Sequence, residues 1–178
     1  MHKSLLNQKE IDAIKHDFSN GIYISCKYNE YTLHNLKKWI DDNRIRIPKP
    51  INVSDAHSTV VYSKSNFAAP SVEGINNLLP RFSFFPKSFK ILGKEEDEFK
   101  ALTLILDAPF LEDLHYKFLS HGAAHDFDDY IPHVTISYGV TDDFNVNVLP
   151  LPNFVFKPTF LVVEPLNNEW SNVEDLVS

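Results

Sequence analysis

Cysteine, glycine and long apolar runs are scarce in this chain of 178 residues, and these scarcities exclude several classes of protein. Cys26 is the only cysteine, so there is no disulfide framework and no cysteine-based zinc site, which fits a reducing cytosol. Apolar runs end after a few residues, as in Phe160–Val163, whereas a membrane-spanning helix needs about 20. Five glycines against eleven prolines indicate many rigid connections. We therefore expect a cytoplasmic protein with no membrane partner.

Positive charge is also in short supply. The chain has 17 Lys and Arg against 24 Asp and Glu, for a formal net charge of −7. Proteins that hold long DNA or RNA carry a basic face. The acidic total does not exclude a local basic groove, but it favours a short ligand with few phosphates over a nucleic-acid polymer. With 43% hydrophobic residues, the chain has the composition and length of one globular domain, which we expect to span residues 1–178.

Apolar periodicity predicts an irregular alternation of helices and strands. Helices are predicted at 4–18, 33–42 and 109–120, and strands at 21–28, 57–63, 88–92, 99–107, 133–138 and 154–163. The segment 66–80 is predicted to be a loop with a helical turn, and the acidic run 95–98 to be a solvated hairpin turn. Pro158 interrupts the last strand, which points to an edge or a bulge. The pattern predicts an α+β fold with antiparallel sheets.

Two segments of the sequence share one pattern: residues 57–62 read HSTVVY and residues 133–138 read HVTISY. In a strand, positions i and i+2 project from the same face. Each element therefore presents an imidazole and a hydroxyl side by side, from His57 with Thr59 and from His133 with Thr135.

Two such pairs suit the cleavage of a phosphodiester next to a ribose 2′-OH. One imidazole removes the 2′-OH proton while the other protonates the leaving 5′-oxygen, and each hydroxyl donates to a non-bridging phosphate oxygen. The product would be a 2′,3′-cyclic phosphate, formed without a metal or another cofactor. Two other readings stay open: ordinary strand histidines, or a two-histidine metal site with Asp55 or Asp128 as third ligand. His115, His121 and His125 are interpreted as surface residues.

The two motifs, their spacing and the order of elements resemble the 2H phosphoesterases, which are named for paired His-x-Ser/Thr motifs. The resemblance implies a bilobal α+β fold in which two antiparallel sheets, flanked by helices, enclose a central groove. It also implies one pseudo-symmetric lobe per motif, with His57, Thr59, His133 and Thr135 as the catalytic tetrad of a phosphoric diester hydrolase.

Four blocks of sequence resemble a narrower group, the phage anti-CBASS phosphodiesterases. They are Gly21–Ser25, Asp55–Tyr62, Ile131–Tyr138 and Glu164–Trp170. Those proteins degrade the cyclic di- and trinucleotide messengers of a bacterial abortive-infection defence. The resemblance implies hydrolysis of 3′,5′ bonds in messengers such as 3′,3′-cyclic GMP-AMP, in the host cytoplasm if a phage encodes the chain. No oligomeric state is implied.

Three residues are candidates for substrate binding. Tyr23 lies on the strand face opposite Ile22 and Ile24, and the family resemblance makes it a candidate for stacking on a base. Glu164 precedes Pro165 and is placed to accept from the amino group of adenine, and Trp170 lies in a polar stretch typical of a ligand or lid role. Two alternatives are retained: an RNA-end 2′,3′-cyclic or 2′-5′ phosphodiesterase, and a sponge that binds cyclic nucleotides without cutting them.

Overall fold

The computed structural model describes residues 18, 20–68, 71–125 and 129–166. The helix predicted at 4–18, apart from its last residue, lies outside the described residues, as do Asp128 and Trp170. Among the described helices, none combines the length and the hydrophobicity needed to cross a membrane.

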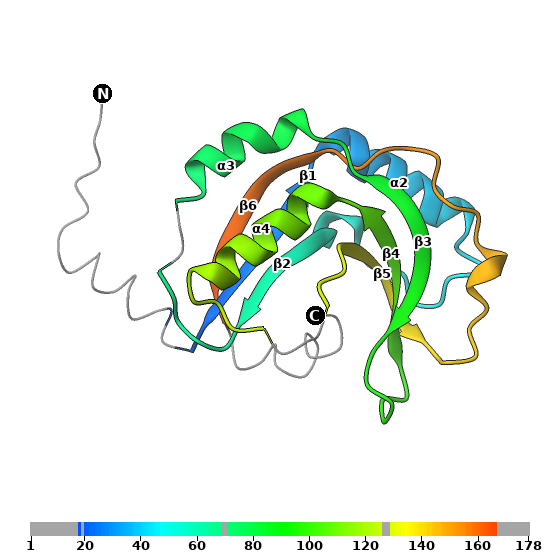
Figure 1. Ribbon diagram of the computed structural model, residues 1–178. Coiled ribbons are helices and arrows are strands. Elements are labelled where there is room, and N and C mark those ends of the chain that lie inside the picture. Colours follow the sequence, from blue (N-terminus) through cyan, green and yellow to red (C-terminus); the bar gives the residue numbers. More distant parts are fainter. Residues whose placement is uncertain (1–17, 19, 69–70, 126–128, 167–178) are drawn as a thin grey trace.

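Two antiparallel sheets of three strands form the framework, which confirms the predicted α+β class (Figure 1). The first sheet has the order β2 (His57–Ser63), β1 (Ile22–Tyr28), β6 (Pro158–Pro165). The second sheet has the order β3 (Phe85–Leu92), β4 (Lys100–Asp107), β5 (His133–Val140). β2 and β5, which carry the two His-x-Thr motifs, are therefore edge strands of different sheets.

Within the described residues, three α-helices flank the sheets: α2 (Glu30–Asp42), α3 (Glu73–Leu78) and α4 (Pro109–Ser120). α3 contacts β6 and α4 contacts β2, as Figure 1 shows. Short 3-10 turns lie at η1 (Val53–Asp55), η2 (Leu79–Arg81) and η3 (Val146–Val148). α2 begins earlier than the predicted Leu33 because Asn29 caps it, accepting a hydrogen bond from the Thr32 amide at 2.9 Å.

One cluster of buried apolar side chains spans both sheets and includes Ile24 of β1, Leu104 of β4 and Ile136 of β5. Phe84 and Phe156, both fully buried, pair through an isolated bridge that links the chain before β3 to the chain before β6. The two halves of the molecule therefore share their core.

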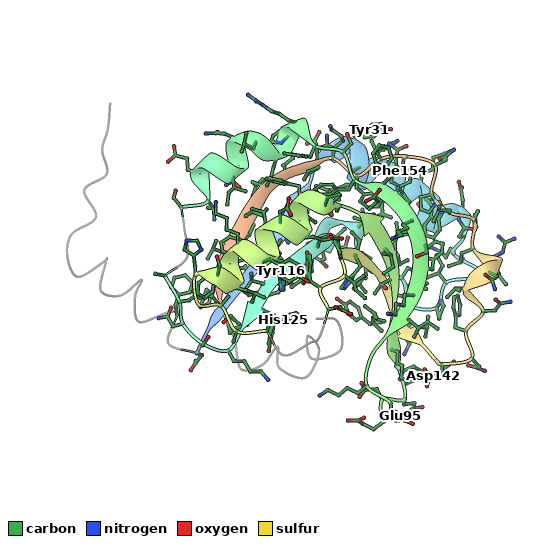
Figure 2. The ribbon with its side chains drawn as sticks, viewed as in Figure 1. Tyr31, Glu95, Tyr116, His125, Asp142 and Phe154 are labelled. Atoms are coloured by element: carbon green, nitrogen blue, oxygen red, sulfur yellow. The ribbon has the colours of Figure 1, made fainter. Side chains whose placement is uncertain are left out.

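The last strand starts later than predicted. β6 begins at Pro158, because residues 154–156 leave the first sheet to meet Phe84. The register between β1 and β6 shifts at Lys27/Tyr28, opposite Pro158, so the predicted bulge at an edge strand is confirmed. The acidic run is the predicted exposed turn between β3 and β4, and Figure 2 shows Glu95 at its tip.

Candidate active site

A buried hydrogen bond joins the strands that carry the two motifs. Ser58, between His57 and Thr59, is fully buried and donates from Oγ to the carbonyl oxygen of His133 at 2.8 Å. The Tyr28 hydroxyl, 2.6 Å away, donates in turn to Ser58 Oγ. The side chain of the middle residue of the first motif is thus bonded to the first residue of the second motif.

The two histidines are held in the same way. His57 donates from Nδ1 to the carbonyl of Asp55 at 2.7 Å, and His133 donates from Nδ1 to the carbonyl of Ile131 at 2.7 Å. Each ring is therefore bound to the carbonyl two residues before it. This contact assigns the proton of the neutral ring to Nδ1 and leaves Nε2 as the nitrogen that accepts a proton.

The register of the first sheet places further side chains on the face that carries His57 and Thr59. Cross-strand partners project from the same face. Lys27 pairs with His57, and Tyr23 pairs with both Tyr62 and Glu164. Glu164 is partly exposed at the end of β6, so the structure brings this predicted residue to the face of the motif.

A β-bulge aligns these residues. The register between β1 and β2 shifts at Ile24/Ser25, where Ser25 pairs with Thr59 and Ile24 pairs with Val61. Val60 is the extra residue of the bulge, so Tyr62 returns to the face that Thr59 occupies. The alternation of the sequence alone does not reveal this displacement.

Tyr23 contacts the first motif through its hydroxyl group. The oxygen lies 2.8 Å from His57 Nε2 and 2.8 Å from Thr59 Oγ1. Because neutral His57 carries its proton on Nδ1, Tyr23 donates to Nε2, and Thr59 donates to the Tyr23 oxygen. The Tyr23 side chain is only 4% exposed and stands edge-on to the imidazole, with ring centroids 6.1 Å apart.

The stacked rings of Tyr130 and His115 hydrogen-bond to the backbone at the bulge. The Tyr130 hydroxyl donates to the carbonyl of Thr59 at 2.7 Å, and His115 Nδ1 donates to the carbonyl of Val60 at 2.6 Å. The two rings stack with centroids 4.2 Å apart and planes 6° apart. These contacts fix the main chain that carries the Thr59 hydroxyl. Sequence reasoning missed both residues.

The interpretation of His115 as a surface residue is wrong, since it is 1% exposed. Its position on α4 has the spacing of the buried face, which also includes Leu111, Leu114 and Phe118. Burial lowers the pKa of His115, although its hydrogen bond to the Val60 carbonyl opposes this effect. His121 is exposed, as expected, and His125 is half-buried.

The four motif residues line two pockets. The smaller has a volume of about 150 Å³, and the larger about 270 Å³. Thr59 and His133 line the smaller pocket, whereas His57 and Thr135 line the larger one. Each pocket is therefore lined by the histidine of one motif and the threonine of the other, and His115 and His125 also line the smaller pocket.

Electrostatics favour a neutral His57. Burial lowers the pKa of His57 below its usual value of about 6.5, and the positive charges of Lys27 and His133 lower it further. The hydrogen bond to the Asp55 carbonyl and the charge of Asp55 act in the opposite direction. Near pH 7 the His57 ring is therefore a proton acceptor. The influence of His133 also indicates that the two imidazoles lie close enough to interact.

No described group of three or more His, Cys, Asp or Glu side chains is arranged to hold a metal ion. Asp55, the first candidate for a third metal ligand, is exposed at the wall of the larger pocket.

The family model and two relatives found by sequence agree on one family. The family model described as "Anti-CBASS protein Acb1" matches residues 20–173. A relative of that name from Enterobacteria phage T4 is 33% identical over 159 residues, covering 88% of this chain and 95% of the relative. A second, from Salmonella phage S16, is 30% identical over 166 residues, covering 90% and 96%. Among solved structures, E. coli LigT complexed with 3′-AMP is 13% identical and covers 80% of this chain and 85% of LigT, with a TM-score of 0.49.

Proposed function

This chain belongs to the Acb1 family of anti-CBASS proteins, and on that premise we propose that it is a phosphodiesterase that opens the 3′,5′ bonds of cyclic di- and trinucleotide messengers. The observation that carries the proposal is that two pockets are each lined by the histidine of one motif and the threonine of the other. A phosphodiester at the centre has an imidazole and a hydroxyl on each side, and the nucleotides that it joins extend into the two pockets.

His57 is the general base of the proposed reaction. Its neutral ring takes the proton of the 2′-OH on Nε2, and the 2′-oxygen attacks phosphorus. The bond from phosphorus to the 5′-oxygen breaks, and protonated His133 gives its proton to that oxygen. The products of this step are a 2′,3′-cyclic phosphate and a free 5′-OH. His57 ends protonated and His133 neutral, and proton exchange with water resets both.

Three polar side chains support this step. Thr59 and Thr135 donate to the non-bridging phosphate oxygens, where negative charge gathers in the transition state. Lys27, opposite His57 on β1, supplies a positive charge at the same face. The Tyr23 hydroxyl holds the His57 ring before the substrate arrives, and the 2′-OH takes its place at Nε2.

Glu164, the cross-strand partner of Tyr23, accepts from the amino group of adenine. Trp170, which lies outside the described residues, is assigned a ligand or lid role from the sequence alone. We assign the activity to the cytoplasm of the infected host, where the messengers are made. An intact ring carries only two or three phosphates, in agreement with an acidic chain of net charge −7.

The decisive experiment incubates the protein with a panel of cyclic nucleotides in EDTA and separates the products by chromatography. We expect rapid loss of 3′,3′-cyclic GMP-AMP. Inertness toward every cyclic nucleotide, with activity on RNA ends, would instead favour an RNA-end phosphodiesterase. Tight binding in calorimetry, with intact ligand recovered after denaturation, would favour a sponge.

A further inference from the structure

The bulge in β2 decides which face of the first sheet carries the first motif. The ladder pairs on either side of it are Ile24 with Val61 and Ser25 with Thr59. If the ladder ran on from the first pair without an extra residue, Thr59 would pair with Cys26, which is fully buried in the core. The bulge at Val60 therefore turns Thr59 away from the core and toward the face that carries Tyr23.

A bulge takes main-chain groups out of the ladder, and a buried carbonyl without a partner costs free energy. The described sheet ends at β2, so side chains take the place of a further strand. The Thr59 carbonyl accepts from the Tyr130 hydroxyl at 2.7 Å, and the Val60 carbonyl accepts from His115 Nδ1 at 2.6 Å. Because the two donor rings stack 4.2 Å apart in nearly parallel planes, these consecutive carbonyls point to the same side of β2, whereas those of a regular strand point to opposite sides.

Both donors are chemically suited to lasting bonds. Burial raises the pKa of Tyr130 well above its usual value, so the hydroxyl keeps its proton. Burial lowers the pKa of His115, the bond to the Val60 carbonyl opposes this effect, and the charge of His125 adds to it. The neutral His115 ring carries its proton on Nδ1, since Nε2 is buried with no hydrogen-bond partner among the described groups. The two rings therefore act as fixed donors to the bulge.

The segment that carries Tyr130 also holds the second motif. Tyr130 lies three residues before His133, and the carbonyl of Ile131, between them, accepts from His133 Nδ1 at 2.7 Å. The same segment thus orients His133 and bonds to the main chain of Thr59. Thr59 and His133 both line the smaller pocket. The Tyr130 bond therefore sets the Thr59 hydroxyl in place relative to the imidazole of the other motif.

We propose that Tyr130 and His115 are positioning residues, which hold the Thr59 hydroxyl at the phosphate through the main chain of the bulge. The inference rests on the proposed function, in which Thr59 donates to a non-bridging phosphate oxygen. Without its two side-chain donors the bulge relaxes, and the Thr59 hydroxyl leaves the position that the transition state requires. A displacement of this kind lowers the rate of the chemical step more than it weakens binding.

The test measures one substitution in two backgrounds. Tyr130→Phe keeps the ring stacked on His115 and removes the hydroxyl. In the wild-type background we expect kcat for 3′,3′-cyclic GMP-AMP to fall by about tenfold with little change in KM. In the Thr59→Ala background the same substitution should lower kcat by less than about twofold, because the group that it positions is already absent. A general structural defect would lower kcat equally in both backgrounds.

Two substitutions of similar shape test His115. His115→Asn retains an N–H donor close to the position of Nδ1, whereas His115→Leu has none. We expect His115→Leu to lose about tenfold in kcat and His115→Asn to retain most of the wild-type value. Equal losses in the two variants would overturn the role given to the bond from His115 to Val60.

Trp39→Phe is the matched control. The Trp39 indole also donates from an aromatic ring to a main-chain carbonyl, that of Pro150 at 3.1 Å, and it stacks on another ring. Trp39 lies on α2 and lines neither pocket, so kcat should not change. An unchanged kcat in Tyr130→Phe, or a loss in Trp39→Phe equal to that in Tyr130→Phe, would overturn the proposal. So would a full tenfold loss from Tyr130→Phe in the Thr59→Ala background.

A crystal structure of Tyr130→Phe separates this inference from the proposed function, because it needs no substrate. We expect Thr59 Oγ1 to move out of hydrogen-bond reach of the Tyr23 oxygen, from which it now lies 2.8 Å away. An unmoved Thr59 would overturn the inference whatever the activity. If the wild-type protein cleaves no cyclic nucleotide, the proposed function fails, and this structure alone decides whether Tyr130 positions Thr59.

Discussion

The hydroxyl oxygen of Tyr23 lies 2.8 Å from Nε2 of His57, the ring nitrogen that the proposed reaction uses as its base. The same oxygen lies 2.8 Å from Oγ1 of Thr59. One buried phenol thus orients both functional groups of the first motif while its ring packs edge-on against His57 and Tyr62. The second motif has its own support, through the bond between His133 and Ile131.

Tyr23→Phe is expected to lower kcat by about tenfold with little change in KM, because the ring stays packed while His57 and Thr59 lose their common partner. Steady-state kinetics with 3′,3′-cyclic GMP-AMP measure both constants. The control is Tyr62→Phe, a change at the neighbouring buried tyrosine on β2. A kcat equal to that of the wild type would mean that Tyr23 acts through its ring alone.

His57→Ala and His133→Ala are each expected to lower kcat by at least about 100-fold, with binding largely preserved, since each removes a proton carrier. Thr59→Ala and Thr135→Ala should cost less, because each removes a neutral donor. His34→Ala, at an exposed position of α2, is the control for the substitution itself. A tenfold or smaller loss in both histidine variants would contradict the assignment of the acid–base pair.

The acid limb of the kcat/KM profile should lie below pH 6.5, because burial and the nearby positive charges lower the pKa of His57. The base works when it is deprotonated, so a lower pKa extends activity toward acid pH. Lys27→Gln removes one of these charges and should move the limb toward higher pH, whereas Lys37→Gln on the exposed face of α2 should not. A limb that moves toward lower pH in Lys27→Gln would contradict the role given to His57.

Ser58→Ala should lower the free energy of unfolding by about 1–3 kcal/mol, because the buried Tyr28 hydroxyl and the His133 carbonyl both lose their partner. Ser25→Ala is the matched control on the adjacent strand. Ser25 is fully buried as well, but its hydroxyl has no partner among the described groups. Its removal should leave the stability unchanged or raise it. Chemical denaturation measures both variants, and equal losses would show that the bond to His133 is not the cause.

Local signals explain which parts of this fold the sequence predicts. β2 and α4 have the predicted bounds, because β-branched residues follow His57 and because Pro109 begins the helix. The face of Tyr23 follows from strand alternation. The contact of its hydroxyl with Thr59 depends on the partner strand and on the bulge at Val60, which no local pattern encodes.

The hydrogen bonds that hold the candidate site join residues far apart in the chain, so sequence patterns could not predict them. Ser58 meets His133 across 75 positions of the chain, and Tyr130 meets Thr59 across 71. The same holds for the larger pocket, whose walls come from residues 51–57 and from β5. In the sequence, Ser58 has the pattern of an ordinary strand residue. Its bond to His133 forms only when the second sheet packs against β2.

The bond from Ser58 to His133 joins β2 to β5, so the two sheets cannot separate at the candidate site without exposing a buried hydroxyl. The two motif strands are therefore held in one arrangement. In the proposed reaction, little of the binding free energy would be consumed in assembling them, and selectivity among cyclic messengers would depend on how well the shape of each ring fits that arrangement.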